Sequence, residues 1–197
     1  MPGIDELLSA CRPDDVAVVV DAAELAARNA LRDFDAPTGC VALALFGGDL
    51  LSDGLGAIAM QIATRADRER SLALPAAERF WDAWAAGTYE LEWECGPVPE
   101  SDEHSEAERR VFAVLEDLAE DPSRVVLDRV AWRLTRDPPL ANVSPEFVAF
   151  VADNQMSVDL ARSLRYVTPP AIVDALRAQR LFDNPLEDYD ELAGDES

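Results

Sequence analysis

The chain has no lysine and a single histidine, and these absences exclude several kinds of enzyme. Without lysine there is no Schiff-base amine, no phosphate-binding lysine of the Walker type and no kinase-type lysine. The single histidine, His104, lies among acidic residues in a stretch that we expect to be exposed, so a serine or cysteine nucleophile has no sheltered base. A histidine-rich metal site is excluded for the same reason. We therefore expect a protein that binds rather than catalyses, without a cofactor or a metal ion.

Cysteine is also scarce, and long apolar runs are missing. Cys11, Cys40 and Cys95 are odd in number, far apart and without a Cys-x-x-Cys pair, which argues against a disulfide framework and a zinc knuckle. No stretch approaches the ~18 apolar residues that a membrane span needs, and the first residues carry no basic region. These observations predict a soluble, cytoplasmic protein that does not contact membranes.

Positive charge as a whole is in short supply. The 197 residues carry 39 acidic side chains against 17 arginines, which gives a formal charge of −22. Such a surface repels nucleic acid and favours basic partners. A GC-rich genome, whose codons favour arginine over lysine, or a salt-adapted proteome would explain part of this composition without any function.

The acidity is concentrated in segments. Residues 100–122 carry 9 acidic residues and 2 arginines, whereas residues 123–180 carry 6 acidic residues and 8 arginines. Residues 183–197 add 7 acidic residues and no base. We expect this acidic C-terminal tail to solvate the chain, to cover the arginines or to contact a basic partner. With 49% hydrophobic residues, residues 1–182 should form one globular domain.

Hydrophobic patterns indicate several strands. Continuous apolar runs at 40–46 and 147–152 are typical of strands buried on both faces, and we expect the second of them to be central in its sheet. Residues 144–146, which precede the second run, are also a helix-start signal, so a helix is the alternative there. In the run at 56–63, the alternating Ile and Met residues favour another strand over the start of a helix that continues through Arg70. Residues 89–94 alternate strictly between acidic and large apolar side chains, which predicts a strand with one wet face.

Capping signals and helical spacing place the helices. Ser105 with Glu108 has the spacing of a capping box, and Asp121 before Pro122 has that of a cap followed by a first-turn proline. The two helices that start there should form a hairpin. Further helices are expected at 14–34, 75–87 and 168–181. The sequence therefore predicts a single α+β domain, with a small mixed or antiparallel sheet of three to four strands covered by five to six helices.

The acidic face of the strand at 89–94 is the most concrete candidate for a binding surface. Residues two apart on a strand share a face at about 6.6 to 7 Å, so its glutamates form a row of negative charge that would meet the arginines or lysines of a partner. Nearby tryptophans would add aromatic anchors, namely Trp81, Trp84 and Trp93. The alternative is the solvated face of an edge strand, with the tryptophans in the core. The predicted partner-binding residues are Glu90, Glu92, Trp93, Glu94, Asp102, Glu103 and Glu106.

A stripe of arginines is the second candidate. Arg129, Arg133 and Arg136 are three and four residues apart, so they share one face of a helix and would bind an anion. The alternative is pairing within the chain, for example with Glu116 or Glu120 of the preceding helix.

The order of elements resembles that of uncharacterised bacterial α+β domains of the polymorphic-toxin immunity-protein type. The matching stretches are residues 41–46 with the following turn and residues 147–153, followed by 163–165 and 169–170. The resemblance implies no catalytic residues. Together with the acidity, it leads us to expect a non-enzymatic acidic domain that binds a basic protein partner as an immunity or inhibitor protein. The alternatives are a small enzyme or ligand-binding domain with a carboxylate/arginine site, and a structural subunit that pairs with itself.

Overall fold

A computed structural model describes residues 3–32, 39–47, 55–89, 91–99, 101–152 and 158–182, and these form eight α-helices, one 3₁₀ turn and four strands. The strands are β1 (Ala42–Gly47), β2 (Ala57–Ala63), β3 (Leu91–Pro97) and β4 (Val148–Val151). The helices are α1 (Ile4–Ser9), α2 (Pro13–Leu31), α3 (Arg65–Ala73), α4 (Ala76–Trp84), α5 (Asp102–Leu115), α6 (Pro122–Arg136), α7 (Val158–Val167) and α8 (Pro170–Ala178), with the 3₁₀ turn η1 (Ala86–Thr88). The predicted single α+β domain is confirmed, although the described residues form more helices than the five to six expected. The acidic tail at 183–197 lies outside the described residues.

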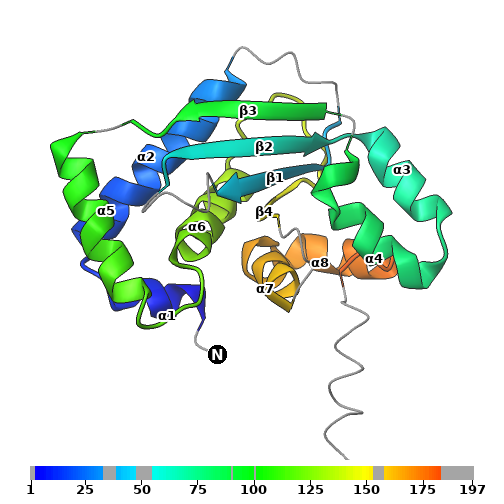
Figure 1. The fold of residues 1–197 in the computed structure, drawn as a ribbon. Helices are drawn as coiled ribbons and strands as arrows, with labels where there is room; N and C mark the ends of the chain where they lie inside the picture. Colours follow the sequence, from blue (N-terminus) through cyan, green and yellow to red (C-terminus); the bar gives the residue numbers. More distant parts are fainter. Residues whose placement is uncertain are drawn as a thin grey trace, which may run out of the picture.

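The four strands form one mixed sheet in the order β3-β2-β1-β4 (Figure 1). The pairs β1–β2 and β2–β3 are antiparallel, whereas β4 pairs with β1 in parallel. A parallel pair needs a long crossover, and the helices between β2 and β4 supply it. The prediction that β4 is a central strand is wrong, because it lies at the end of the order. All four of its residues are nevertheless buried, since helices rather than a further strand cover it.

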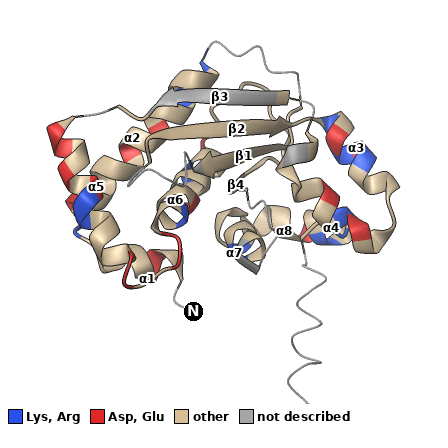
Figure 2. Ribbon diagram, in the orientation of Figure 1, with Lys and Arg blue, Asp and Glu red and all other residues tan. Residues whose placement is uncertain are grey.

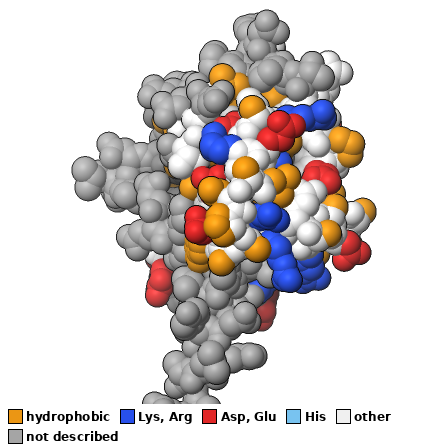
Figure 3. All heavy atoms as spheres, turned by 90° about the vertical axis from the view of Figure 1, so that its right-hand side faces the viewer, with side chains coloured by type: hydrophobic (Ala, Val, Ile, Leu, Met, Phe, Trp, Pro, Cys, Tyr) orange, Lys and Arg blue, Asp and Glu red, His pale blue; other side chains and the backbone are white. Residues whose placement is uncertain are grey.

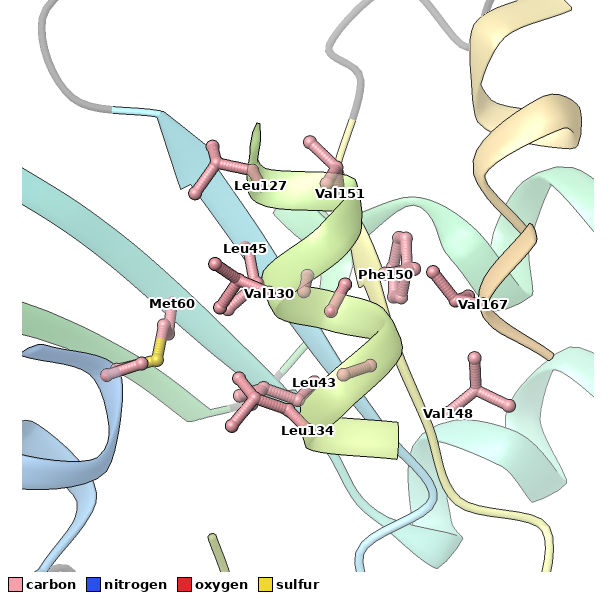
Figure 4. Packing of buried hydrophobic residues seen from close by; sticks show 14 of the residues in the cluster. Leu43, Leu45, Met60, Leu127, Val130, Leu134, Val148, Phe150, Val151 and Val167 are labelled. Carbon is pink, nitrogen blue, oxygen red and sulfur yellow. The ribbon is translucent and has the colours of Figure 1, made fainter. Parts of the chain in front are cut away.

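One face of the parallel strand pair packs against α6. Leu127, Val130 and Leu134 follow one another along α6 and lie beside Leu43 and Leu45 of β1 (Figure 4). All five side chains are at most 1% exposed. This row is the helical periodicity expected of an amphipathic helix lying on apolar strands.

The other face of β4 packs against α4 and α7. Val148 and Phe150 point toward Val167 of α7 (Figure 4). The ring of Phe150 meets that of Trp84 edge to face, with centroids 5.1 Å apart. Helices on both faces explain why this strand is apolar at every position.

The long helix α2 is confirmed, and it separates the two helices that were expected to form a hairpin. Its buried side chains recur at helical spacing, and it packs against α5, α6 and β3. Helices α5 and α6 contact α2 far more than each other. This end of the molecule is therefore built from α1, α2 and α5, while α3, α4 and α8 lie at the opposite end (Figure 1).

Candidate partner-binding face

The glutamates of the predicted acidic strand fall at the edge of the sheet. Glu92, Trp93 and Glu94 belong to β3 and pair with residues 59–61 of β2. β3 is the first strand in the sheet order, so its outer edge has no neighbouring strand in the described part of the chain. Glu90 lies outside the described residues, as do the side chains of the other three. Their role in binding therefore stays a prediction.

Three further predicted residues lie at the start of α5. Asp102, Glu103 and Glu106 are all exposed. The helix is capped by Ser101, whose Oγ accepts a hydrogen bond from the backbone N–H three residues later at 3.0 Å. The predicted capping box at Ser105 is thus wrong, because α5 begins earlier. The carboxylates in its first turn lie at the positive end of the helix dipole, which is a favourable place for them.

His104 is buried, which corrects the expectation that it is exposed. Because α5 begins at Asp102, this side chain turns toward the core, and only 6% of it is exposed. Its Nε2 lies 4.0 Å from Oε2 of Glu108, and its Nδ1 is buried without a hydrogen-bond partner among the described residues. The other carboxylate oxygen of Glu108 accepts a 2.7 Å hydrogen bond from the backbone N–H of Leu55. Glu108 therefore helps to hold the fold and is not part of the exposed acidic surface.

Arg129, the first arginine of the predicted stripe, is held by α1 and α7. Its Nη1 lies 3.3 Å from Oδ1 of Asp5 and donates a 3.0 Å hydrogen bond to the hydroxyl of Tyr166. That hydroxyl donates in turn to Asp5 at 2.8 Å. Burial raises the pKa of Tyr166 to about 12, although the hydrogen bond from Arg129 acts in the opposite direction. The tyrosine is consequently neutral at physiological pH.

The other two arginines of the stripe are also engaged within the chain. Arg133 Nη1 lies 2.5 Å from a carboxylate oxygen of Asp21 and 3.0 Å from one of Glu24, both on α2. Arg136 donates to the backbone carbonyl of Trp132 at 3.0 Å and stacks over that indole ring at 3.8 Å. Intramolecular pairing is therefore what the structure shows. The carboxylate partners of Arg129 and Arg133 come from α1 and α2 rather than from α5, because α2 lies between α5 and α6.

A pocket of about 320 Å³ opens beside Arg129 and Arg133, between α1, α2 and α6. Asp5 and the buried Cys11 also line it. Burial, with a smaller contribution from the charge of Asp15, raises the pKa of the Cys11 thiol, so this thiol is not activated as a nucleophile. Because both arginines already face carboxylates, an anionic ligand would have to compete with these for the guanidinium groups.

The loop between α5 and α6 carries acidic residues that the sequence analysis counted but did not assign to the binding set. Glu116, Asp117 and Glu120 are exposed. Asp121 accepts a 3.0 Å hydrogen bond from the backbone N–H of Arg124 and caps α6, as predicted. The sequence did contain a signal for this surface, because residues 116–121 carry four carboxylates and only one of them is needed as a helix cap.

A second pocket, of about 380 Å³, lies between this loop, α1, α6 and α7. Its lining includes Asp128, which is 2% exposed and accepts a hydrogen bond from Oγ of Ser163. Arg124 is also part of the lining, and its Nη2 donates to the carbonyl of Val151 at 3.4 Å, beside the carboxyl end of β4. Sequence reasoning missed this pocket, because its walls come from four segments that are distant along the chain.

Charge divides the described residues into two unlike ends. Helices α1 and α5 with the loop to α6 carry 10 acidic residues and 2 arginines, whereas α3, α4 and α8 carry 5 of each. Figure 2 shows acidic residues, coloured red, in the first half of α5 and along the loop that follows it. At the opposite end of the molecule, arginine, acidic and apolar side chains are mixed (Figure 3). We use the name acidic face for the exposed carboxylates of Asp102, Glu103, Glu106, Glu116, Asp117 and Glu120.

Comparison of the chain with protein-family models, with curated proteins and with solved structures found no match. None of the helices in the described ranges is long and apolar enough to cross a lipid bilayer. Among the same residues, no three histidine, cysteine or carboxylate side chains are grouped closely enough to hold a metal ion.

Proposed function

We propose that this protein is a non-enzymatic binding domain that recruits a basic protein partner through the acidic face, as an immunity or inhibitor protein does. The observation that supports the proposal is that most of these exposed carboxylates have no partner among the described residues. Glu106 lies near Arg109 and Arg110, but the side chains of the other five members form no ion pair or hydrogen bond with another described residue. By contrast, three of the four carboxylates along α2, those of Asp15, Asp21 and Glu24, are paired with arginines.

The arrangement suits long-range attraction followed by contact. The acidic face extends along α5, whose 14 residues span about 21 Å. Exposed charges act over about 10 Å at moderate ionic strength, so these carboxylates act together on an approaching cation. Single exposed ion pairs contribute little, whereas a field of one sign increases the association rate and selects the partner.

The first experiment compares two variants with the same change in net charge. A basic partner is captured at low salt, identified and purified, and its affinity is then measured for each variant over a range of ionic strength. One variant neutralises Asp102→Asn, Glu103→Gln and Glu106→Gln on the acidic face. The matched control neutralises three exposed residues at the other end, Glu69→Gln, Glu78→Gln and Asp174→Asn.

We expect the first variant to bind about tenfold more weakly and with a smaller dependence on salt, since each lost charge pair contributes up to about 1 kcal/mol. The control should bind within about twofold of the unmodified protein, because its charges lie at the far end of the molecule. If both variants lost the same affinity, the net charge of the protein and not the position of the acidic face would explain the effect. No loss in the first variant, or no basic partner at low salt, would reject the proposal.

The glutamates of the β3 region form a second part of the proposed surface. Charge reversal of Glu90, Glu92 and Glu94 should weaken binding further, since these residues alternate with large apolar residues in the sequence and are predicted to share one face. If the affinity for the partner were unchanged, these glutamates would not belong to the binding surface. The contribution of α5 would then be judged only by the variants of the acidic face.

A further inference from the structure

Negatively charged side chains lie at the C-terminal end of α5, where the helix dipole is also negative. This end is the negative one, so acidic side chains there lower the stability of the folded protein. Helices α2, α3, α6, α7 and α8 have an arginine in the last turn, whereas α5, like the shorter α1 and α4, has no basic residue there. It is followed instead by Glu116 and Asp117, both exposed. Stability alone disfavours this placement, and a cation bound from outside would remove the conflict.

An apolar wall stands beside these two carboxylates. Leu118 follows them, is 45% exposed, and borders the pocket of about 380 Å³ together with Ile4 and Leu7 of α1. Five carboxylates and two arginines, Arg124 and Arg162, belong to the same lining, so the pocket has an excess of negative charge. An apolar wall next to an excess of carboxylates is complementary to a long side chain that ends in a positive charge.

We propose that this pocket receives an arginine side chain of the basic partner, an inference that rests on the proposed function. The guanidinium donates paired hydrogen bonds to the carboxylates of Glu116 and Asp117, and its methylene stem lies against Leu118. Lysine fits less well, because its ammonium group is a compact, strongly hydrated point charge that does not offer two parallel donors to a carboxylate. The partner therefore presents an exposed arginine within its basic surface.

The pocket can be tested without the partner. An acetylated and amidated tripeptide Gly-Arg-Gly is titrated into the full chain, and the backbone amide signals are followed by NMR. Two further peptides replace arginine by citrulline, which has the same shape without the charge, or by lysine. We expect the arginine peptide to shift the amides of Leu118, Ala119 and Val125, and the citrulline peptide to bind about tenfold or more weakly, because it loses charge-assisted hydrogen bonds.

A pair of variants separates binding from stability. Glu116→Gln with Asp117→Asn should weaken the arginine peptide about tenfold and raise the Tm of the free protein by about 2 °C, because two charges opposed to the helix dipole are removed. Glu69→Gln with Asp174→Asn is the matched control, because both residues are exposed, lie outside the acidic face and belong to α3 and α8 at the opposite end of the molecule (Figure 1). It changes the charge equally, but it should leave both the Tm and the peptide shifts at the pocket unchanged.

Each result decides something. The pocket assignment is overturned if citrulline binds as well as arginine, if the shifts fall elsewhere, or if the Glu116 and Asp117 variant binds the peptide normally. A fall in Tm for that variant would also count against it, since the carboxylates would then be stabilising the free protein. The proposed function survives these failures if neutralising the start of α5 still weakens the partner. Conversely, the pocket could bind the arginine peptide specifically while neutralising the acidic face leaves the affinity for the partner unchanged. This result would reject the proposed function but not the pocket assignment.

Discussion

Ser163 donates a hydrogen bond from its Oγ to Oδ1 of Asp128 where α7 meets α6. Ser163 is fully buried and Asp128 is 2% exposed. The same hydroxyl oxygen accepts a hydrogen bond from the backbone N–H of Val151 at 3.4 Å, so one side chain connects α6, α7 and β4. A buried carboxylate is costly unless it is hydrogen-bonded, which makes the serine important for the stability of this junction.

Ser163→Ala should lower the free energy of unfolding by about 1–3 kcal/mol, because the change deprives a buried carboxylate of a donor. Urea denaturation measures the loss. In Ser163→Ala combined with Asp128→Ala, the total cost should be smaller than the sum of the single costs, as expected for residues in one hydrogen-bond network. Additive costs would show that the two side chains act independently.

Trp84 anchors the chain that follows α8. Its Nε1 donates a 2.5 Å hydrogen bond to the carbonyl of Leu181, and both residues are at most 1% exposed. Trp84→Phe keeps most of the apolar ring but leaves that carbonyl without this donor, so we expect a loss of about 1–3 kcal/mol in unfolding free energy. Hydrogen exchange at the Leu181 amide, which donates to Leu176, should become faster. The control is Trp81→Phe, whose ring is half-buried and whose loss should be smaller.

Arg68 is buried, and neither of its terminal nitrogens donates a hydrogen bond to another described residue. It is 6% exposed, Nη1 lies 3.9 Å from Oε2 of Glu146, and the guanidinium lies 5.5 Å from the centre of the Trp84 ring. Burial lowers the pKa of Arg68, although nearby Tyr89 and Glu146 oppose this. Arg68→Met should change stability by less than about 1 kcal/mol or increase it, since buried ion pairs are often replaceable by apolar side chains. Arg68→Ala should cost about 2 kcal/mol or more, because it leaves a cavity. Equal losses in thermal unfolding of the two variants would show that the charge itself stabilises the fold.

The sequence could predict those elements whose stability comes from apolar periodicity. Helix α2 and strands β1, β2 and β4 are of this kind, because their buried positions follow the helix or strand repeat. Helix α3 was missed as a separate element, and its buried residues explain why. Asp67, Arg68 and Ser71 are polar, so the helix is specified by side-chain hydrogen bonds that a hydrophobic pattern does not register.

The candidate site was predictable in its charge but not in its geometry. The acidity of residues 100–122 is visible in the sequence, and it is exposed at both ends of α5. The partners of Arg133 were expected on α5 and are on α2, because tertiary packing places α2 between the two. The orientation of His104 depended on the first residue of α5, and a helix boundary is what sequence patterns define least well.

Asp67 makes the free energy of unfolding depend on pH, and this dependence can be measured separately from the effect of net charge. Its Oδ2 accepts hydrogen bonds from the backbone N–H and the hydroxyl of Thr64, both at 2.8 Å, and its Oδ1 accepts one from Arg70 at 2.9 Å. Burial by itself would raise the pKa of this carboxyl, but the bonds from Thr64 and Arg70 outweigh it and hold the pKa below its usual value. Its contribution to stability is therefore fully present above the unfolded pKa of about 3.9 and is lost as the pH falls through the lower folded value.

Asp67→Asn should consequently cost about 1 kcal/mol in urea denaturation at about pH 7, because an uncharged amide replaces the capping carboxylate. The cost should stay constant down to about pH 5 and shrink below about pH 4, because the carboxyl of the unfolded wild-type chain binds a proton there while that of the folded protein does so only at lower pH. Glu69→Gln is the control on the same helix, because Glu69 is exposed and its side chain forms no ion pair or hydrogen bond with another described residue. Its small effect should not follow this pattern. The carboxyl of Asp67 titrates in this pH range, whereas the amide of the variant does not. If Asp67→Asn therefore cost as much at about pH 3 as at about pH 7, the charge of the carboxylate would make no contribution to the cap.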